Sequence, residues 1–184
     1  MKKWILISPV VLLLAACGSG SESESGSEKD FADQLLGKWE QPCTVSNGNQ
    51  GRQMFLEFYA QDVTISQTVY SDTSCEFPYI DSAQDGSYTV SSSPDNTFYF
   101  IDFRTKVTYL GFYEDFFIAV LNSDQVCGYD DWAVGVKRDV TNCQGEISYS
   151  FAGDLIMPVI LEGGRLYITD GSSTPSSTYF DKVE

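Results

Sequence analysis

The residue types that carry most enzyme chemistry are scarce in this chain of 184 residues. It has no histidine, which excludes Ser-His-Asp and Cys-His nucleophilic systems and zinc sites that contain histidine. It also lacks a Gly-x-Ser-x-Gly motif. Adjacent acidic residues occur at Glu114-Asp115 and Asp130-Asp131, but neither pair has the ligand spacing of a calcium loop. We therefore expect no enzyme activity, no metal site and no cofactor.

The charge of the chain is strongly negative. There are 11 Lys and Arg residues against 26 Asp and Glu residues, which gives a net charge of -15 at pH 7. Proteins that bind nucleic acid contact its phosphate backbone through clustered cations, and none are clustered here. The composition therefore argues against nucleic acid as a partner.

The first 17 residues have the features of an export signal. The basic pair Lys2-Lys3 precedes an apolar stretch over residues 4–14, which is too short to span a bilayer as a helix. The segment Leu14-Ala15-Ala16-Cys17 then resembles the bacterial lipobox, in which the cysteine thiol is acylated before cleavage. We expect residues 1–16 to be a lipoprotein signal peptide and Cys17 to carry the lipid. Cleavage would remove two lysines and change the net charge from -15 to -17.

The segment after Cys17 is predicted to be a tether between membrane and domain. Two or three acyl chains on one cysteine are enough for stable anchoring. Residues 18–30 contain only Gly, Ser and charged residues, so they cannot bury apolar surface to offset the entropy of ordering them. We expect them to be flexible. Gly18 follows the cysteine, and this resemblance to Gram-negative lipoproteins implies anchoring in the cell envelope, at the outer membrane.

Residues 31–184 fit one domain, and their apolar residues alternate with polar ones almost throughout. Such period-two segments predict β-strands. They comprise Met54, Leu56 and Phe58; Val63, Ile65 and Val69; Tyr99, Ile101, Phe103, Val107 and Tyr109 on one face; Trp132, Val134 and Val136; Ile147, Tyr149 and Phe151; Leu155, Met157, Val159 and Leu161; and Leu166 and Ile168. Turn signals such as Gln84-Asp85-Gly86 separate them, and only residues 31–36 suggest a helix. About eight to ten strands with short connections indicate an antiparallel barrel or sandwich.

Four cysteines follow Cys17, namely Cys43, Cys75, Cys127 and Cys143. An even number in an exported domain predicts two disulfides, with three possible pairings. A metal site is not favoured, because there is neither a Cys-x-x-Cys pair nor a histidine. We favour the pairs Cys43–Cys75 and Cys127–Cys143, because each joins segments that are close in the sequence.

Several segments together carry a family resemblance. A Gly-x-Trp motif in Leu36-Gly37-Lys38-Trp39 precedes an alternating strand, and it is followed by Cys43, the run 69–75, Asp85-Gly86-Ser87-Tyr88 and the run 164–171. This order resembles a group of bacterial lipocalin-like lipoproteins, calycin-type barrels of mostly undefined function. The resemblance covers residues 35–91 and 163–183 and leaves the middle third unassigned.

The resemblance implies an all-β fold, a short up-and-down antiparallel β-barrel. In such a barrel Gly37 and Trp39 would be structural, with Trp39 closing one end and packing against a cation near the C-terminus, Arg165 or Lys182. Because the middle third is unassigned, a β-sandwich is the alternative fold.

Aromatic residues are abundant, with 12 Phe, 11 Tyr and 3 Trp. Pairs such as Phe112-Tyr113 and Phe116-Phe117 would put rings on both faces of their strands. These rings suit a thick core, or one face could line the apolar pocket that barrels commonly hold at one mouth. For such a pocket we predict walls formed by Phe58, Tyr99, Phe103 and Trp132.

Two non-enzymatic functions fit these features. The first is a membrane-anchored envelope lipoprotein that binds a small hydrophobic or amphipathic ligand. The alternative is a protein-interaction module, an inhibitor or accessory subunit, that binds a basic envelope protein through its acidic surface. A cavity of a few hundred Å³ inside the barrel would favour the first function, and a filled core would favour the second.

Overall fold

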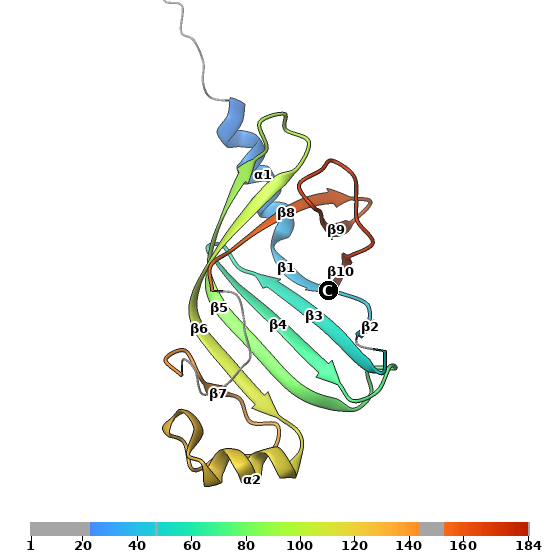
Figure 1. Ribbon diagram of the computed structural model, residues 1–184. Coiled ribbons are helices and arrows are strands. Elements are labelled where there is room, and N and C mark those ends of the chain that lie inside the picture. The colour runs from blue at the N-terminus through green and yellow to red at the C-terminus, as the bar shows by residue number, and fades with distance from the viewer. Residues whose placement is uncertain (1–22, 47, 144–152, 184) are drawn as a thin grey trace, which may run out of the picture.

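The computed structural model describes residues 23–46, 48–143 and 153–183, and most of its ordered elements are strands (Figure 1). The strands are β1 (Gly37–Glu40), β2 (Thr44–Ser46), β3 (Gln50–Phe58), β4 (Asp62–Tyr70), β5 (Pro78–Ser92), β6 (Tyr99–Phe112), β7 (Arg138–Asp139), β8 (Leu155–Glu162), β9 (Arg165–Ile168) and β10 (Tyr179–Val183). The described helices are α1 (Ser23–Leu35), α2 (Asp115–Ser123) and the short 3-10 helix η1 (Val126–Gly128). The predicted signal peptide, residues 1–16, and Cys17 lie outside the described residues.

Eight of the strands form a closed barrel. They pair in the order β1, β3, β4, β5, β6, β8, β9 and β10, and β10 pairs back with β1. All these pairings are antiparallel, so the barrel is of the up-and-down type. The short strands β2 and β7 extend the pairing on β3 and β6. The predicted lipocalin-like barrel fold is confirmed in place of the sandwich, and α1 and α2 lie at opposite ends of it (Figure 1).

Trp39 lies beside α1 at one end of the barrel. Its side chain is 1% exposed, and its indole N–H donates to the carbonyl oxygen of Leu35 at 2.6 Å. The Nζ atom of Lys182 lies 5.1 Å from the ring centroid, within cation–π range. Of the two predicted cations, it is therefore Lys182 and not Arg165 that takes this position. Gly37 has φ +107° between α1 and this residue, a conformation that favours glycine.

Helix α1 corrects the predicted tether. The helix begins at Ser23, so residues 23–30, which we expected to be flexible, are helical, and the predicted helix over 31–36 is only its last part. Tertiary contacts explain the difference. The carboxylate of Glu28 accepts hydrogen bonds from the backbone N–H and hydroxyl of Ser92, and the ring of Phe31 stacks on Tyr99 with centroids 3.9 Å apart. These contacts with the barrel offset the entropy lost when residues 23–30 become ordered, which their own side chains could not offset in isolation.

A β-bulge interrupts the ladder between β5 and β6. Gly86 pairs with Thr105 and Asp85 pairs with Val107, which leaves Lys106 as the extra residue. The predicted turn over residues 84–86 is therefore wrong, because these residues continue a strand of 15 residues.

The bulge also reverses which residues of β6 face the barrel interior. One extra residue moves every later side chain to the opposite side of the strand. Val107 and Tyr109 were predicted to share the face of Ile101 and Phe103, and this prediction is wrong. Beyond the bulge the buried hydrophobic side chains are instead Leu110 and Phe112, which are 1% and 5% exposed.

Helix α2 corrects a second prediction. Phe116 and Phe117 were expected on a strand, but they lie in the first turns of α2. Residues 132–136 were also expected to form a strand, and they form a loop after η1. A short apolar run does not show whether its residues follow a helical or a strand periodicity, so packing against the rest of the protein decides its secondary structure. The strand predicted over residues 147–151 lies outside the described residues.

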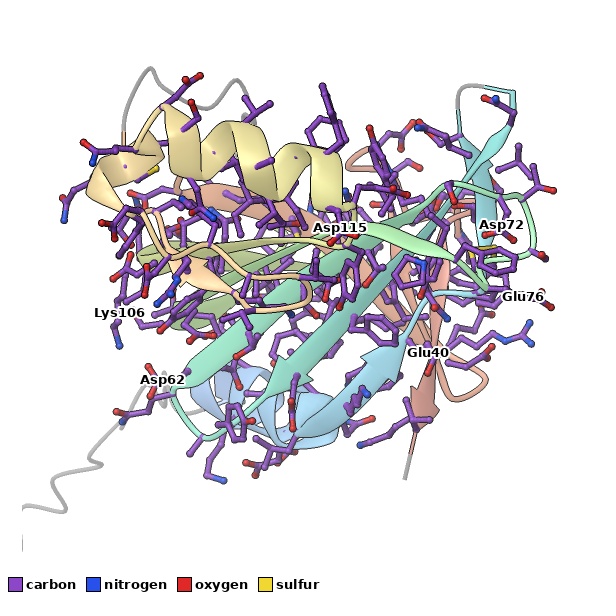
Figure 2. All side chains as sticks on the ribbon, turned by 90° about the horizontal axis from the view of Figure 1, so that it is seen from below. Glu40, Asp62, Asp72, Glu76, Lys106 and Asp115 are labelled. Carbon is purple, nitrogen blue, oxygen red and sulfur yellow. A yellow bond between two sulfur atoms is a disulfide. The ribbon has the colours of Figure 1, made fainter. Side chains whose placement is uncertain are left out.

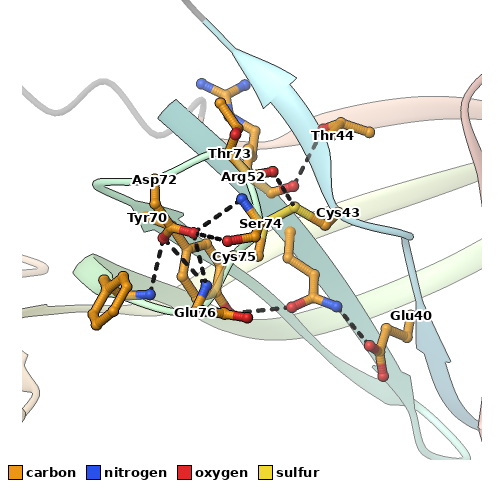
Figure 3. The surroundings of a disulfide bond; sticks show 12 residues. Glu40, Cys43, Thr44, Arg52, Tyr70, Asp72, Thr73, Ser74, Cys75 and Glu76 are labelled. Atoms are coloured by element: carbon orange, nitrogen blue, oxygen red, sulfur yellow. Dashed lines mark hydrogen bonds between the residues drawn. A yellow bond between two sulfur atoms is a disulfide. The ribbon is translucent and has the colours of Figure 1, made fainter. Parts of the chain in front are cut away.

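Both predicted disulfides are confirmed: Cys43 is bonded to Cys75, and Cys127 is bonded to Cys143. The first fastens the residue directly before β2 to the loop between β4 and β5 (Figure 3). In that loop the carboxylate of Asp72 accepts hydrogen bonds from the hydroxyl and backbone N–H of Ser74 and from the backbone N–H groups of residues 76 and 77. These bonds, the Ser74 hydroxyl foremost, lower the pKa of Asp72 to about 2.

Candidate functional site

The structure brings three of the four predicted pocket residues together. Phe58 and Phe103 lie in the core nearest α1, and Tyr99 packs against that core. Trp132 lies elsewhere, in a second apolar cluster with Ile80, Leu110 and Phe112. The four residues therefore do not form one pocket wall.

The core nearest α1 is filled by side chains. The wall of an empty pocket would keep surface accessible to water, yet Phe58 is 2% exposed and Phe103 is 0% exposed. The same complete burial holds for Leu35, Leu56, Ile101, Val159, Leu166 and Phe180. In this structure Phe58 and Phe103 are thus core residues with no accessible cavity beside them.

A polar layer that was not predicted from the sequence lies inside the barrel beyond this core. Gln41 follows Trp39 on the inward face of its segment, Gln84 lies opposite Ile65, and Ser82 lies two residues before Gln84 on the same face. The exposed fractions of Gln41, Ser82 and Gln84 are only 8%, 2% and 6%. The signal was present as polar residues at inward positions of otherwise apolar strands.

Most groups of this polar layer have hydrogen-bond partners. The Ser82 hydroxyl donates to the carbonyl oxygen of Gln67 at 3.2 Å, and the Gln84 amide donates to the Thr105 hydroxyl at 3.5 Å. The Oε1 atom of Gln41 is buried without a partner among the described residues. An unsatisfied buried acceptor is costly, so this oxygen is a point where a hydrogen-bond donor would bind favourably.

A surface cleft of about 490 Å³ lies outside the bulge, and Asp62, Thr64, Asp85 and Lys106 contribute its polar lining. The Nζ atom of Lys106 pairs with Asp62 at 2.7 Å, and Figure 2 shows these two side chains side by side. The Thr64 hydroxyl donates to Asp85 at 2.7 Å. Because these groups bind one another, the cleft does not offer them to a ligand.

The barrel surface carries an excess of negative charge that its cations do not balance. Six of the nine Lys and Arg residues in the described part of the chain form ion pairs with aspartates, namely Lys29, Arg104, Lys106, Lys137, Arg138 and Arg165. Two more, Lys38 and Lys182, lie over aromatic rings. Figure 2 shows Glu40 on β1, Asp72 and Glu76 together in the loop between β4 and β5, and Asp115 on α2. The surface thus presents carboxylates, while eight of its nine described basic residues, all but Arg52, pair with an aspartate or lie over an aromatic ring.

One carboxylate, Asp81 on β5, is buried and ties the end of the barrel to the segment after η1. It accepts hydrogen bonds from the hydroxyls of Thr68 at 2.6 Å and Tyr113 at 2.8 Å, and Lys137 Nζ lies 3.5 Å away. Burial and the bond to Asp81 together raise the pKa of Tyr113 to about 12. This cluster joins strands β4 and β5 to the segments that hold Tyr113 and Lys137, and it is a structural anchor.

We define residues 114–143 as the α2 cap. Trp132 organises it: the Asn122 side chain both donates to and accepts from the Trp132 backbone, at 3.0 and 2.7 Å. The Trp132 indole N–H donates to the carbonyl oxygen of Val126 at 3.2 Å. With the Cys127–Cys143 disulfide, these bonds hold the helix and its loop as one unit against the barrel.

The described residues contain no group of three or more acidic or cysteine side chains arranged to hold a metal ion. Within that same part of the chain, no helix has the length and apolar character needed to cross a membrane. Comparison of the chain with protein-family models and with curated protein sequences found no match. The class that the structure itself defines is an eight-stranded, up-and-down, lipocalin-like barrel with a closed apolar core and an acidic surface.

Proposed function

We propose that this protein is a lipid-anchored envelope protein that binds a basic partner protein through its acidic surface. The observation that carries the proposal is the filled core, in which Phe103 has no accessible surface and Phe58 has almost none. A barrel that stored a small apolar molecule at these residues would need space beside them. The molecular surface is therefore the favoured place for binding.

Charge supports a basic partner. The net charge is -15 for the whole chain, and most cations of the described part are already paired with carboxylates or aromatic rings. A surface with one dominant sign of charge attracts oppositely charged proteins and increases their association rate. Positively charged envelope proteins would be drawn to this surface, and acidic ones would be repelled.

The position of α1 supports an oriented anchor. Only five residues separate Cys17 from Ser23, where α1 begins, so the chain can place the helix at most about 20 Å from an acylated Cys17. The contacts of Glu28 and Phe31 hold α1 at one end of the barrel. An anchor at Cys17 would keep that end near the membrane and leave α2 pointing away from it (Figure 1).

A second candidate function is the binding of a small amphipathic ligand inside the barrel. The observation that favours it is the unpartnered Oε1 atom of Gln41 in the polar layer, because a ligand with a donor group could satisfy it. Such a ligand would have to displace side chains that are now packed.

The experiment uses the mature chain, residues 17–184, carrying Cys17→Ala so that it is not acylated. Binding to lysozyme, as a basic probe protein, and to a neutral protein of similar size is measured by calorimetry at low and high salt. We expect saturable binding to lysozyme that weakens steeply with salt, and no binding to the control. Native mass spectrometry of protein extracted from its own membrane tests the second function. A stoichiometric small molecule together with no lysozyme binding would reject the surface function in favour of the interior one.

A further inference from the structure

Helix α2 has an apolar face that no other described element covers. None of its residues is buried. One face, with Phe117, Ile118 and Leu121, packs against the second apolar cluster. The other face carries Phe116 and Val120, four residues apart and therefore adjacent on the helix surface, and they are 73% and 41% exposed.

This exposure is unusual for residues of these types. An isolated exposed aromatic side chain is common, but a stripe along one helix leaves contiguous apolar surface in water. Ala119 is also exposed, and it lies between Phe116 and Val120 on the same side of the helix. We call Phe116, Ala119 and Val120 the α2 stripe.

The ends of the α2 stripe are acidic. Glu114 and Asp115 stand at the N-terminus of the helix and Asp124 at its C-terminus, and its last turn contains no basic residue. None of these three has an ion-pair partner among the described residues. The two cations of the α2 cap are engaged, Lys137 with Asp81 and Arg138 with Asp131. Apolar surface is thus flanked on both sides by uncompensated negative charge.

The α2 cap is also well suited to present a fixed surface. The Cys127–Cys143 disulfide and the hydrogen bonds between Asn122 and Trp132 fasten it, so binding would order few groups. In Figure 1 the cap forms the end of the molecule opposite α1. That end would face away from a membrane in which Cys17 is anchored.

We infer that the α2 stripe, with its acidic ends, docks a cationic amphipathic helix of the basic partner protein. This inference rests on the proposed function and names its contact. Apolar residues of the partner would cover Phe116 and Val120, and lysine or arginine residues on both sides would meet Glu114, Asp115 and Asp124. Complementarity of charge and of apolar area at one place supplies the specificity that diffuse attraction lacks.

Two other occupants fit less well. An anionic membrane surface would be repelled by the carboxylates at both ends of the stripe. A second copy of this chain would place equal acidic ends near each other in a two-fold contact. A cationic helix would be attracted, not repelled, by the carboxylates at both ends of the stripe.

The test uses the mature chain with Cys17→Ala and three synthetic 18-residue peptides as probes. One is an amphipathic helix of leucine and lysine, one has the same composition in scrambled order, and one has glutamate in place of lysine. Affinity is measured by fluorescence anisotropy at two salt concentrations. Variants are Phe116→Ser, the double change Glu114→Gln with Asp115→Asn, and the control Ile156→Ser, which alters a residue 59% exposed on β8.

We expect the amphipathic lysine peptide to bind one-to-one and more tightly than the scrambled peptide, and the glutamate peptide not to bind. Phe116→Ser should weaken binding about tenfold or more, as for an interface aromatic residue, while Ile156→Ser should leave it unchanged. The double acidic change should reduce both the affinity and its salt dependence. Thermal unfolding checks that each variant remains folded.

Other outcomes overturn the inference in distinguishable ways. If both lysine peptides bind equally and Phe116→Ser has no effect, the acidic surface binds but α2 is not the site. If neither peptide nor lysozyme binds, the proposed function fails as well. Binding to anionic vesicles that Phe116→Ser abolishes would assign the stripe to a membrane. Self-association in sedimentation that Phe116→Ser abolishes would assign it to a second copy.

Discussion

Gly86 of β5 lies directly against the ring of Phe103 in β6. A Cβ atom at position 86 would stand 2.5 Å from Cε2 of Phe103 and closer still to the carbonyl oxygen of Arg104. The bulge at Lys106 sits beside this contact in the same ladder. The buried ring therefore occupies the space that a side chain at Gly86 would need. The contact lies next to the bulge, after which the opposite set of β6 residues faces the barrel interior.

Gly86→Ala should accordingly be strongly destabilising. The added methyl group meets backbone as well as a buried ring, so the free energy of unfolding should fall by about 1–3 kcal/mol or more. Chemical denaturation of the mature domain measures the change. Gly153→Ala is the matched control, because a Cβ there meets nothing within 4 Å. Equal stability of the two variants would contradict the packing of Phe103 over Gly86.

Trp39→Ala should lower the free energy of unfolding by about 3–5 kcal/mol, because it truncates a fully buried aromatic side chain. Trp39→Phe should cost less, through loss of the hydrogen bond to Leu35 and weakening of the contact with Lys182. Denaturation curves of both variants give the values. Phe77→Ala, at a position 63% exposed, is the control and should be nearly neutral. A Trp39→Ala variant as stable as this control would show that Trp39 does not close the barrel.

Removal of either disulfide by paired Cys→Ser changes should lower stability by roughly 2–4 kcal/mol. The loops closed by Cys43–Cys75 and Cys127–Cys143 span 32 and 16 residues, so the chain-entropy model predicts a somewhat larger loss for the first. Peptide mapping without reduction checks the pairing, and thermal unfolding checks the loss. Crossed linkages in the native protein would refute the observed pairing.

Tyr113 should make stability fall at alkaline pH. Its pKa is raised in the fold to about 12, above the ordinary value of about 10, because burial and Asp81 favour the neutral phenol. The unfolded chain therefore loses this proton first as pH rises, and the contribution of Tyr113 is complete below pH 10 and lost between about pH 10 and 12. Tyr113→Phe should have a shallower decline over that range. Parallel stability curves for the variant and the parent protein would contradict the burial of this hydroxyl beside Asp81.

Cys17→Ala should prevent lipid attachment if residues 14–17 are a lipobox. The precursor should remain uncleaved and should not incorporate a fatty-acid probe in cells, whereas Cys43→Ala should still be labelled. Gel mobility and probe fluorescence report both steps. Normal processing or labelling of the Cys17→Ala precursor would refute the lipobox.

The strands and the two disulfides could be predicted because their signals are local, whereas the preference for a barrel over a sandwich came from the family resemblance. Alternation at Leu56 and Phe58 defines an inward face wherever the strand lies, and the spacing of Cys43 and Cys75 requires only that nearby segments meet. The Gly-x-Trp motif likewise placed Trp39 at the end of the barrel. Each of these features depends on a few neighbouring residues and one periodicity.

The remaining features depended on contacts between distant residues. Whether Lys106 is part of a regular strand or the extra residue of a bulge is decided by Gly86 and Phe103 packing across two strands. Residues 23–30 become helical because the barrel supplies Ser92 as a partner for Glu28. Composition and periodicity describe one segment at a time, so only the tertiary structure could reverse the faces of β6 or leave Phe103 without accessible surface. For the same physical reason, the sequence determined antiparallel strands with an inward apolar face, and the tertiary structure decided that they close into a barrel whose core leaves Phe58 and Phe103 almost without accessible surface.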